Sequence, residues 1–232
     1  VPQTAGTDLG IPATLSIGTN RAQVYIAFGD SISWGDGSND GSGYRTYLEA
    51  NIRSYWGGGP RVLNEGEPGT RSLRGEQRID QSLNRTRPAY TLILYGTNDW
   101  NDGECRNNPP CYTIDALRSM VLQARDASSF PLLGTIPPVN PAFADRDAEA
   151  RNAWVRGMND RIKAMAAPLR VPVADIHDAF TRVPTLSALF SDFLHPNEQG
   201  YTLMAQTWFQ TITRPVAGAS STASAPLFGF VR

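Results

Sequence analysis

The chain has 232 residues, of which 41% are hydrophobic and 19% are charged, and its net charge at pH 7 is −1. This length and apolar content predict a globular protein with one sizeable core or at most two small domains, and they exclude a disordered chain. Acidic and basic residues are nearly equal in number, which does not suggest a strongly basic surface, so we expect neither a nucleic-acid partner nor an anionic membrane partner. The longest uncharged stretch inside the predicted fold, residues 127–144, contains four prolines, so no membrane-spanning helix is predicted.

An apolar stretch near the N-terminus ends in the tripeptide Gly29-Asp30-Ser31. Residues 24–28 include β-branched and aromatic side chains and are bounded by turn residues, which predicts a buried strand. In a parallel sheet, Ser31 would stand at the carboxyl end of this strand, where open α/β sheets bind ligands. On its own, the tripeptide is more typical of a turn and a helix cap, so the remaining chain decides between the two interpretations. A glycine-rich loop is predicted over residues 33–43.

Strands and helices alternate along the rest of the chain, with turn-forming residues between them. The predicted strands are 24–28, 61–64, 90–95, 131–136 and 171–176. The predicted helices are 44–56, 72–84, one capped by Thr113, 145–166 and 197–212, with short helical turns over 180–190. This alternation predicts the α/β class, with five parallel strands covered by helices on both faces. We expect one domain over residues 1–214, which includes an N-terminal arm over 1–22, and an alanine- and serine-rich tail or linker over 215–232.

The two cysteines, Cys105 and Cys111, lie six residues apart in a predicted loop. Two cysteines are too few for a zinc site, and their spacing is not C-x-x-C. A disulfide between them is the favoured interpretation, and two free buried thiols are the alternative. A disulfide would imply an oxidising compartment. Because the chain also starts without methionine, we expect a secreted or periplasmic protein whose signal segment has been removed.

Four predicted loops at the same edge of the sheet carry Ser31, Gly69, Asn98, and Asp192 with His195. A serine hydroxyl becomes a strong nucleophile only when a base takes its proton, and histidine is the natural base near neutral pH. Asp192 precedes His195 by three residues in a non-helical turn, so it can hold the other nitrogen of the imidazole. The backbone N–H groups of Ser31 and Gly69 and the side-chain amide of Asn98 can donate to a tetrahedral oxyanion.

Four sequence blocks follow one another over about residues 24–213: Gly29-Asp30-Ser31, Gly69, Gly96-Thr97-Asn98-Asp99 and Asp192-x-x-His195-Pro196. Together they resemble the blocks of the SGNH (GDSL) hydrolases, a superfamily of serine esterases and lipases. The resemblance implies a flavodoxin-like, three-layer α/β/α sandwich and ester hydrolysis through an acyl-enzyme, without a metal or cofactor. It also implies that Ser31 is the nucleophile, that His195 is the base with Asp192 as its partner, and that Ser31, Gly69 and Asn98 form the oxyanion hole.

Two positions have competing candidates. Either Gly66 or Gly69 can be the glycine of the second block, and Gly69 is preferred because it follows Asn64 by five residues, a common spacing in the family. Gly66 is then expected to serve a turn with positive φ. His177 is the other histidine, and we expect it to be solvated or to cap a helix, with a place in the triad as the alternative.

Trp34 and Trp100 directly follow the Ser31 block and the Asn98 block. We expect both to lie in the cleft and bind substrate, and packing under a loop is the alternative. Asp99 is expected to order its own loop, and Glu65 is expected to be solvated.

The loops predicted to line the site, residues 33–43, 65–71 and 98–110, are mostly polar. We therefore predict a serine esterase that acts on short acyl esters, above all acetyl esters, of a small-molecule or carbohydrate alcohol, and that is a monomer. An acyltransferase with the same residues and a lipase or lysophospholipase are the alternatives, and a non-catalytic carbohydrate-binding module is the rival of a different class. A flavodoxin-like electron carrier is disfavoured, because Asp30 places an acid where a phosphate-binding loop would lie.

Overall fold

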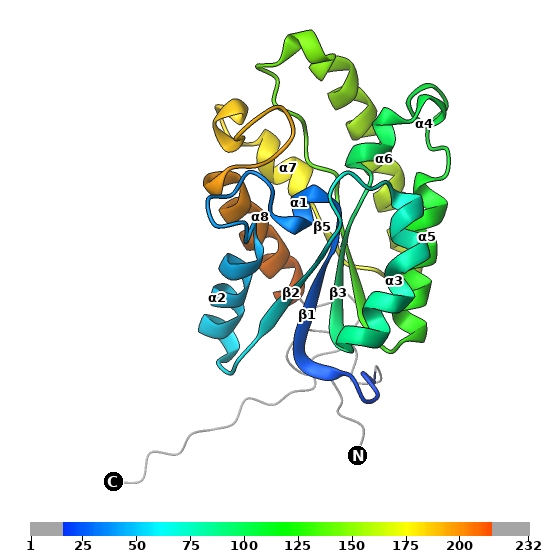
Figure 1. Cartoon of the computed structure of the whole chain (residues 1–232), viewed down its shortest axis with the longest axis vertical. Helices are drawn as coiled ribbons and strands as arrows, with labels where there is room; N and C mark the ends of the chain where they lie inside the picture. The colour runs from blue at the N-terminus through cyan, green and yellow to red at the C-terminus, as the bar shows by residue number, and fades with distance from the viewer. Residues whose placement is uncertain (1–15, 215–232) are drawn as a thin grey trace.

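A parallel five-stranded sheet lies between two layers of helices in the computed structural model, which describes residues 16–214 (Figure 1). The strand order is β2-β1-β3-β4-β5, which is the order of flavodoxin-like folds. The predicted α/β/α sandwich is therefore confirmed. The strands are β1 (Arg21–Gly29), β2 (Arg61–Gly66), β3 (Pro88–Leu94), β4 (Phe130–Gly134) and β5 (Val173–Ala174).

The two central strands are apolar along most of their length. All residues of β3 are buried, and β1 is buried from Val24 onward. A central parallel strand has helices against both faces, so its side chains need not alternate between apolar and polar. In the register of the sheet, Phe28 of β1 stands between Glu65 of β2 and Ile93 of β3, so the carboxyl ends of these three strands lie side by side.

The helices form two separate layers. In Figure 1, α2, α7 and α8 cover one face of the sheet, around Tyr201 and Trp208, whereas α3, α5 and α6 cover the other, around Met158 and Ile162. Within residues 16–214, no helix is both long enough and apolar enough to cross a membrane. The helices are α1 (Ser31–Trp34), α2 (Arg45–Trp56), α3 (Ser72–Thr86), α4 (Gly103–Asn107), α5 (Thr113–Asp126), α6 (Ala148–Leu169), α7 (Ile176–Thr181) and α8 (Glu198–Thr213), with 3₁₀ segments η1 (Thr97–Asn101), η2 (Ala144–Arg146) and η3 (Leu186–Leu189).

The strand order places a topological switch point between β1 and β3. The chain moves from β1 to β2 on one side and later returns to lay β3 on the other side. Such a switch point leaves a crevice at the carboxyl ends of the strands, where ligands bind in open α/β sheets. α1 follows β1 and η1 follows β3, so both segments begin at the carboxyl ends of the strands that flank the switch point.

Two predicted boundaries near the N-terminus are wrong. β1 begins at Arg21, inside the predicted arm 1–22, because Arg21 pairs with Pro88 of β3. α1 extends into the predicted loop 33–43, because the side chain of Asp30 accepts a hydrogen bond from the Ile32 N–H at 3.0 Å and caps the helix. The first fifteen residues of the predicted arm and the predicted tail 215–232 lie outside the described residues.

The predicted strand 171–176 is also too long, since β5 contains only Val173–Ala174. The chain turns into α7 directly afterwards. Asp175 caps that helix by accepting a hydrogen bond from the Asp178 N–H at 3.3 Å. A helix-capping carboxylate thus ends what its apolar neighbours predicted to be a longer strand.

Candidate active site

Ser31 begins α1 immediately after β1, where the chain passes from sheet to helix. Gly29 permits this close approach, because a Cβ there would lie 2.3 Å from both Leu94 O and Ser33 Oγ. Any larger residue would push α1 away from the end of β3. The Ser31 side of the crevice is therefore built from the tight contact between these two segments.

The structure joins Ser31, His195 and Asp192 in one chain of hydrogen bonds. His195 Nε2 lies 3.0 Å from Ser31 Oγ, and His195 Nδ1 lies 2.8 Å from Asp192 Oδ2. An ionised carboxylate can only accept, so Nδ1 donates to Asp192 and Nε2 is left to accept the hydroxyl proton of Ser31. This is an arrangement in which a serine hydroxyl can lose its proton while it attacks a carbonyl carbon.

Asp192 is held in its ionised form by its neighbours. Its Oδ1 accepts the backbone N–H groups of Leu194 at 2.6 Å and His195 at 2.7 Å. Partial burial acts to raise the pKa of this carboxyl, but the hydrogen bonds from His195 and Leu194 and the charge of His195 outweigh it and hold the pKa below its usual range. Asp192 is therefore a constant acceptor for the imidazole at neutral pH.

Asn140, which sequence analysis missed, supports the backbone next to Asp192. Its Nδ2 donates to Asp192 O at 3.2 Å, and its backbone N–H donates to Phe193 O at 2.9 Å. Asn140 lies in the proline-rich connection after β4. No sequence signal links this connection to Asp192, because the two segments meet only in the folded chain.

Gly37 lies directly behind His195. Its φ is +90°, and a Cβ there would lie 2.4 Å from Ser191 Oγ, 2.6 Å from Pro196 O and 2.9 Å from His195 Cβ. A side chain at this position would both strain the backbone and displace the histidine segment. The loop between α1 and α2 therefore limits how far His195 can move away from Ser31.

Asn98 lies in η1 after β3 and is buried. Its Nδ2 donates to Thr70 O at 3.0 Å and lies 3.5 Å from Asp30 Oδ2. These contacts place the Asn98 amide between the Ser31 turn and the loop that contains Gly69. Gly69 has φ +75°, and nothing lies within 4 Å of a Cβ built on it. The structure thus brings Ser31, Gly69 and Asn98 to one edge of the sheet, as predicted from their positions after the strands.

Asp99 orders the Asn98 segment, as expected. Its carboxylate accepts hydrogen bonds from the Ser72 N–H at 2.9 Å, the Ser72 hydroxyl at 2.6 Å and the Thr113 hydroxyl at 2.7 Å. The predicted cap at Thr113 is wrong for this reason: the N-cap of α5 is Tyr112, and the Thr113 hydroxyl is used by Asp99. One buried carboxylate fixes η1 to the starts of both α3 and α5.

Asp30 is a fully buried carboxyl beside Ser31. Burial raises its pKa to about 7, with repulsion from Asp99 adding to the effect, although the hydrogen bond from the Ile32 N–H opposes it. Near neutral pH this carboxyl is therefore divided between its protonated and ionised forms.

Arg78 of α3, which sequence analysis also missed, holds the carboxyl ends of three strands. Its Nη2 donates to Gly29 O at 2.9 Å, to Glu65 O at 2.7 Å and to the Tyr95 hydroxyl at 2.6 Å. Sequence alone does not single out this side chain, because the chain has twenty arginines.

Gly66 is used differently from the expectation. It is not among the glycines with positive φ, so the predicted turn conformation is wrong. A Cβ at Gly66 would lie 2.3 Å from Trp34 N and 2.8 Å from Asp30 O. The glycine is required because the end of β2 packs against the backbone of α1.

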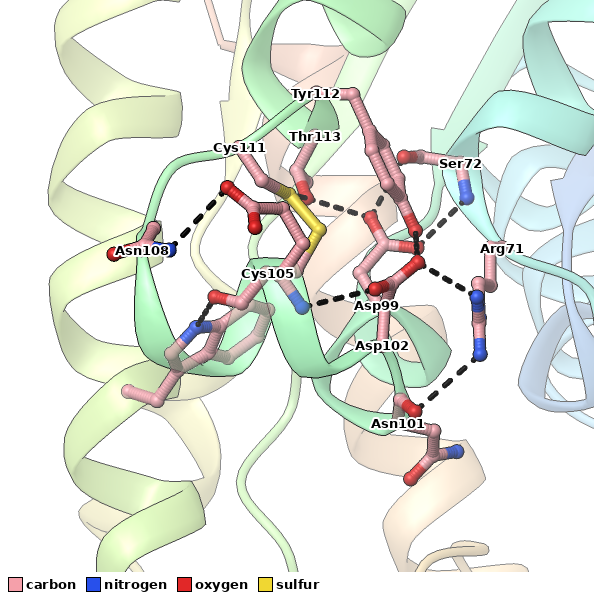
Figure 2. The surroundings of a disulfide bond; sticks show 12 residues. Arg71, Ser72, Asp99, Asn101, Asp102, Cys105, Asn108, Cys111, Tyr112 and Thr113 are labelled. Carbon is pink, nitrogen blue, oxygen red and sulfur yellow. Dashed lines mark hydrogen bonds and ion pairs between the residues drawn. A yellow bond between two sulfur atoms is a disulfide. The ribbon is translucent and has the colours of Figure 1, made fainter.

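The predicted disulfide between Cys105 and Cys111 is present and joins α4, which contains Cys105, to the segment just before α5 (Figure 2). The same segment is tied to α3 by charge, since Arg71 Nη1 lies 2.7 Å from Asp102 Oδ2. Tyr112 donates to that carboxylate oxygen at 3.1 Å. Figure 2 shows Arg71 and Asp102 on the side of the disulfide that faces α3, so the loop after Gly69 is joined to the disulfide segment.

The two tryptophans occupy different environments. Trp34 ends α1 and is 46% exposed. The Trp100 ring packs edge-on against Trp154 at 5.9 Å between centroids, with Arg106 over its face. Trp100 therefore packs under a loop, which was the alternative to a place in the substrate cleft.

Two further expectations concern His177 and Glu65. His177 is half-buried on α7, and the structure places His195 and not His177 beside Ser31. Burial lowers the pKa of His177. Glu65, expected to be solvated, is buried, and its Oε2 accepts hydrogen bonds from Ser82 at 2.8 Å and Arg85 at 2.5 Å. The described part of the chain contains no group of three His, Cys, Asp or Glu side chains that could hold a metal ion.

A profile of the GDSL-like lipase/acylhydrolase family matches residues 27–203. No curated protein sequence matches the chain. Among solved structures, a lipase/acylhydrolase from Enterococcus faecalis superimposes with a TM-score of 0.67 at 21% identity, over 82% of this chain and 95% of that chain. An acetylxylan esterase from Geobacillus stearothermophilus gives a TM-score of 0.65 at 20% identity, over 84% and 96% of the two chains. A G-D-S-L family protein from Desulfitobacterium hafniense gives 0.66 at 18% identity, over 82% and 99%.

Proposed function

The chain belongs to the GDSL-like lipase/acylhydrolase family, and on this basis we propose that it is a serine esterase that hydrolyses carboxylic esters through an acyl-enzyme. The observation that carries this proposal is the chain of hydrogen bonds from Ser31 Oγ through His195 to Asp192. A carbohydrate-binding module has no need of an activated hydroxyl, so the same chain disfavours a non-catalytic role.

In the proposed first step, Ser31 Oγ attacks the ester carbonyl carbon while its proton passes to His195 Nε2. Asp192 stabilises the resulting imidazolium through Nδ1. The imidazolium then gives its proton to the alcohol oxygen as the C–O bond breaks, which leaves the acyl group on Ser31. Water attacks this acyl-enzyme with His195 again as base, and the carboxylic acid and free Ser31 are released.

The oxyanion formed in both steps would accept hydrogen bonds from the backbone N–H groups of Ser31 and Gly69 and from Asn98 Nδ2. One hydrogen of the Asn98 amide is used by Thr70 O at 3.0 Å, which fixes the plane of the amide. The contact with Asp30 Oδ2 at 3.5 Å is at the limit of a hydrogen bond, so that side of the amide is available to an oxyanion.

The proposed substrate is a short acyl ester, above all an acetyl ester, of a small-molecule or carbohydrate alcohol. Loops 33–43, 65–71 and 98–110 are mostly polar, and the half-exposed Trp34 at the end of α1 offers a flat ring that suits the face of a sugar. The acetylxylan esterase of similar fold is consistent with this choice. We further propose that residues 1–214 form one domain and that the protein is a monomer. We also propose that it is secreted or periplasmic, and the disulfide supports this location because such bonds persist in oxidising compartments.

The test is hydrolysis of p-nitrophenyl esters from acetate to palmitate, together with acetate release from acetylated polysaccharides. We expect kcat/KM to be highest for the shortest acyl groups, labelling of Ser31 by a fluorophosphonate, and no turnover in Ser31→Ala. A maximum at eight carbons or longer would indicate a lipase or lysophospholipase. Formation of a new ester in the presence of an alcohol, at the expense of hydrolysis, would indicate an acyltransferase. Turnover in a folded Ser31→Ala variant would refute the proposed nucleophile.

A further inference from the structure

Arg151 contacts two segments of the proposed active site. It lies in the first turn of α6 and is 4% exposed. Its Nη2 donates to Thr97 O at 2.6 Å, and its guanidinium carbon lies 5.5 Å from the centroid of the Phe193 ring. Thr97 directly precedes Asn98, and Phe193 precedes His195 by two residues. One side chain therefore lies between the Asn98 segment and the histidine segment.

The burial of Arg151 destabilises the folded state, which argues against a packing role alone. Its Nε has no hydrogen-bond partner among the described residues. Burial lowers the pKa of Arg151 to about 10, although the charge of Asp30 opposes the shift. A buried cation that is not fully hydrogen-bonded costs free energy that an apolar side chain of similar size would not.

The next residue of α6 supports the other side of the site. Asn152 Oδ1 accepts the Val139 N–H at 2.8 Å, and Asn152 Nδ2 donates to Val139 O at 3.1 Å. Val139 is followed by Asn140, which holds the backbone of Asp192. Through Arg151 and Asn152, the start of α6 thus contacts the Asn98 segment and supports the histidine segment. Arg151 is the residue that touches these two segments directly.

We propose that Arg151 is a positioning residue that fixes the Thr97–Asn98 turn against the segment of Asp192 and His195. Its hydrogen bond to Thr97 O sets the position of the Asn98 amide. Arg151 touches neither substrate nor reacting atoms and acts through Asn98. The inference rests on the proposed esterase function.

The variant Arg151→Met keeps the length of the side chain but removes the charge and the donor. We expect kcat, measured per site titrated with a fluorophosphonate, to fall roughly 10- to 100-fold, which is the loss typical of a misplaced catalytic group. KM should stay within about threefold, since the contact serves the transition state more than substrate binding.

Arg125→Met, at an exposed position of α5, is the control. Arg125 Nη2 also donates to a backbone carbonyl of α6, that of Leu169 at the far end of the helix, and burial also lowers the pKa of Arg125. We expect this variant to lose thermal stability with kcat within about twofold of the wild type, because distant sites act independently. An equal fall in kcat in both variants would overturn the proposal.

A double-mutant cycle with Asn98→Ala tests whether Arg151 acts through Asn98. In the Asn98→Ala background, Arg151→Met should lower kcat by less than about threefold, because residues that act as a unit are not additive. Losses that multiply, or an unchanged kcat in Arg151→Met, would refute the proposal. If Arg151→Met does not fold, Arg151→Leu, which also removes the charge and the donor, takes its place in the cycle. A wild-type protein that hydrolyses no ester refutes the esterase function, whereas an active wild type with an unaffected variant refutes the role of Arg151 alone.

Discussion

His195 is positioned by contacts on both sides of its ring and backbone. Its two ring nitrogens bind Ser31 and Asp192, and the loop at Gly37 closes against its Cβ. Hydrogen bonds set the direction of the ring, whereas the close approach of Gly37 limits the movement of the backbone. The absence of a side chain at Gly37 is therefore as necessary to this geometry as the presence of a carboxylate at Asp192.

Gly37→Ala is expected to lower kcat by roughly 100-fold, because a displacement of about 1 Å costs that much when it moves a catalytic group. Gly41→Ala is the matched control. Gly41 lies in the same loop with φ +70°, but nothing lies within 4 Å of a Cβ built there. Both variants should lose thermal stability through backbone strain, and only Gly37→Ala should lose turnover per titrated site. A similar kcat in the two variants would show that Gly37 does not position His195.

Among the elements, the segment from η1 to α5 is held by several cross-links. It contains the disulfide of α4, the carboxylate of Asp99 that binds α3 and α5, and the pair of Asp102 with Arg71 (Figure 2). α4 is a helix of five residues, which is too short to be stable by itself. The disulfide and the charged pair therefore supply the stability that the helix lacks.

Replacing both Cys105 and Cys111 with alanine is expected to lower the free energy of unfolding by about 2 kcal/mol, because the bond closes a short loop and restricts the unfolded chain. The measurement is urea unfolding of the variant and of the wild type without reductant. The wild type unfolded in the presence of dithiothreitol is the control, and its stability should approach that of the variant. Equal midpoints for the oxidised wild type and the variant would contradict the expected contribution.

The elements also show which parts of the fold can be predicted from the sequence. The apolar runs that end in Gly-Asp-Ser and Gly-Thr-Asn-Asp correctly predict β1 and β3, because an apolar run followed by turn residues is a local signal. The same two runs place Ser31 and Asn98 at the carboxyl edge of the sheet. The end of β5 was misplaced because Asp175, a cap, overrides the apolar pattern around it.

Polar residues whose partners are distant in sequence, and which belong to no recognisable sequence block, could not be predicted. Glu65 is buried because Ser82 and Arg85 of α3 satisfy its carboxylate, and Asn140 is placed by contacts with Asp192 and Phe193. Each of these side chains has an ordinary local sequence around it. Only the packing of helices and loops on the sheet determines which polar group meets which.

At the scale of the whole molecule, Asp30 links folding to pH. Its pKa is raised from 3.8 to about 7 in the folded state. Between about pH 4 and pH 7, the unfolded chain has lost this proton and the folded chain keeps it, so the free energy of unfolding falls as the pH rises. Asp192 acts in the opposite direction and in a lower range, because its pKa is lowered, so its stabilisation is lost only as the pH falls below its ordinary pKa.

Asp30→Asn should remove this dependence, since the amide resembles the protonated carboxyl and keeps an oxygen that can cap α1. Relative to the wild type, the variant should gain up to about 4 kcal/mol in free energy of unfolding between pH 4 and pH 7. Urea unfolding over this pH range measures the difference. Asp80→Asn, at an exposed position of α3, is the control and should show no such trend. If the difference in free energy of unfolding between Asp30→Asn and the wild type did not change with pH, Asp30 would have the same pKa in the folded and unfolded chain, and the prediction would be wrong.

The hydrogen bond between Ser31 and His195 joins residues separated by 164 positions in the chain. During synthesis the serine is made long before its base, and contacts between residues so far apart in sequence form slowly in folding. A fragment that stops before His195 contains the hydroxyl and most of the sheet but nothing to take the proton. An activated Ser31 hydroxyl consequently requires the chain at least as far as His195, so a nascent molecule that stops short of this residue cannot acylate itself.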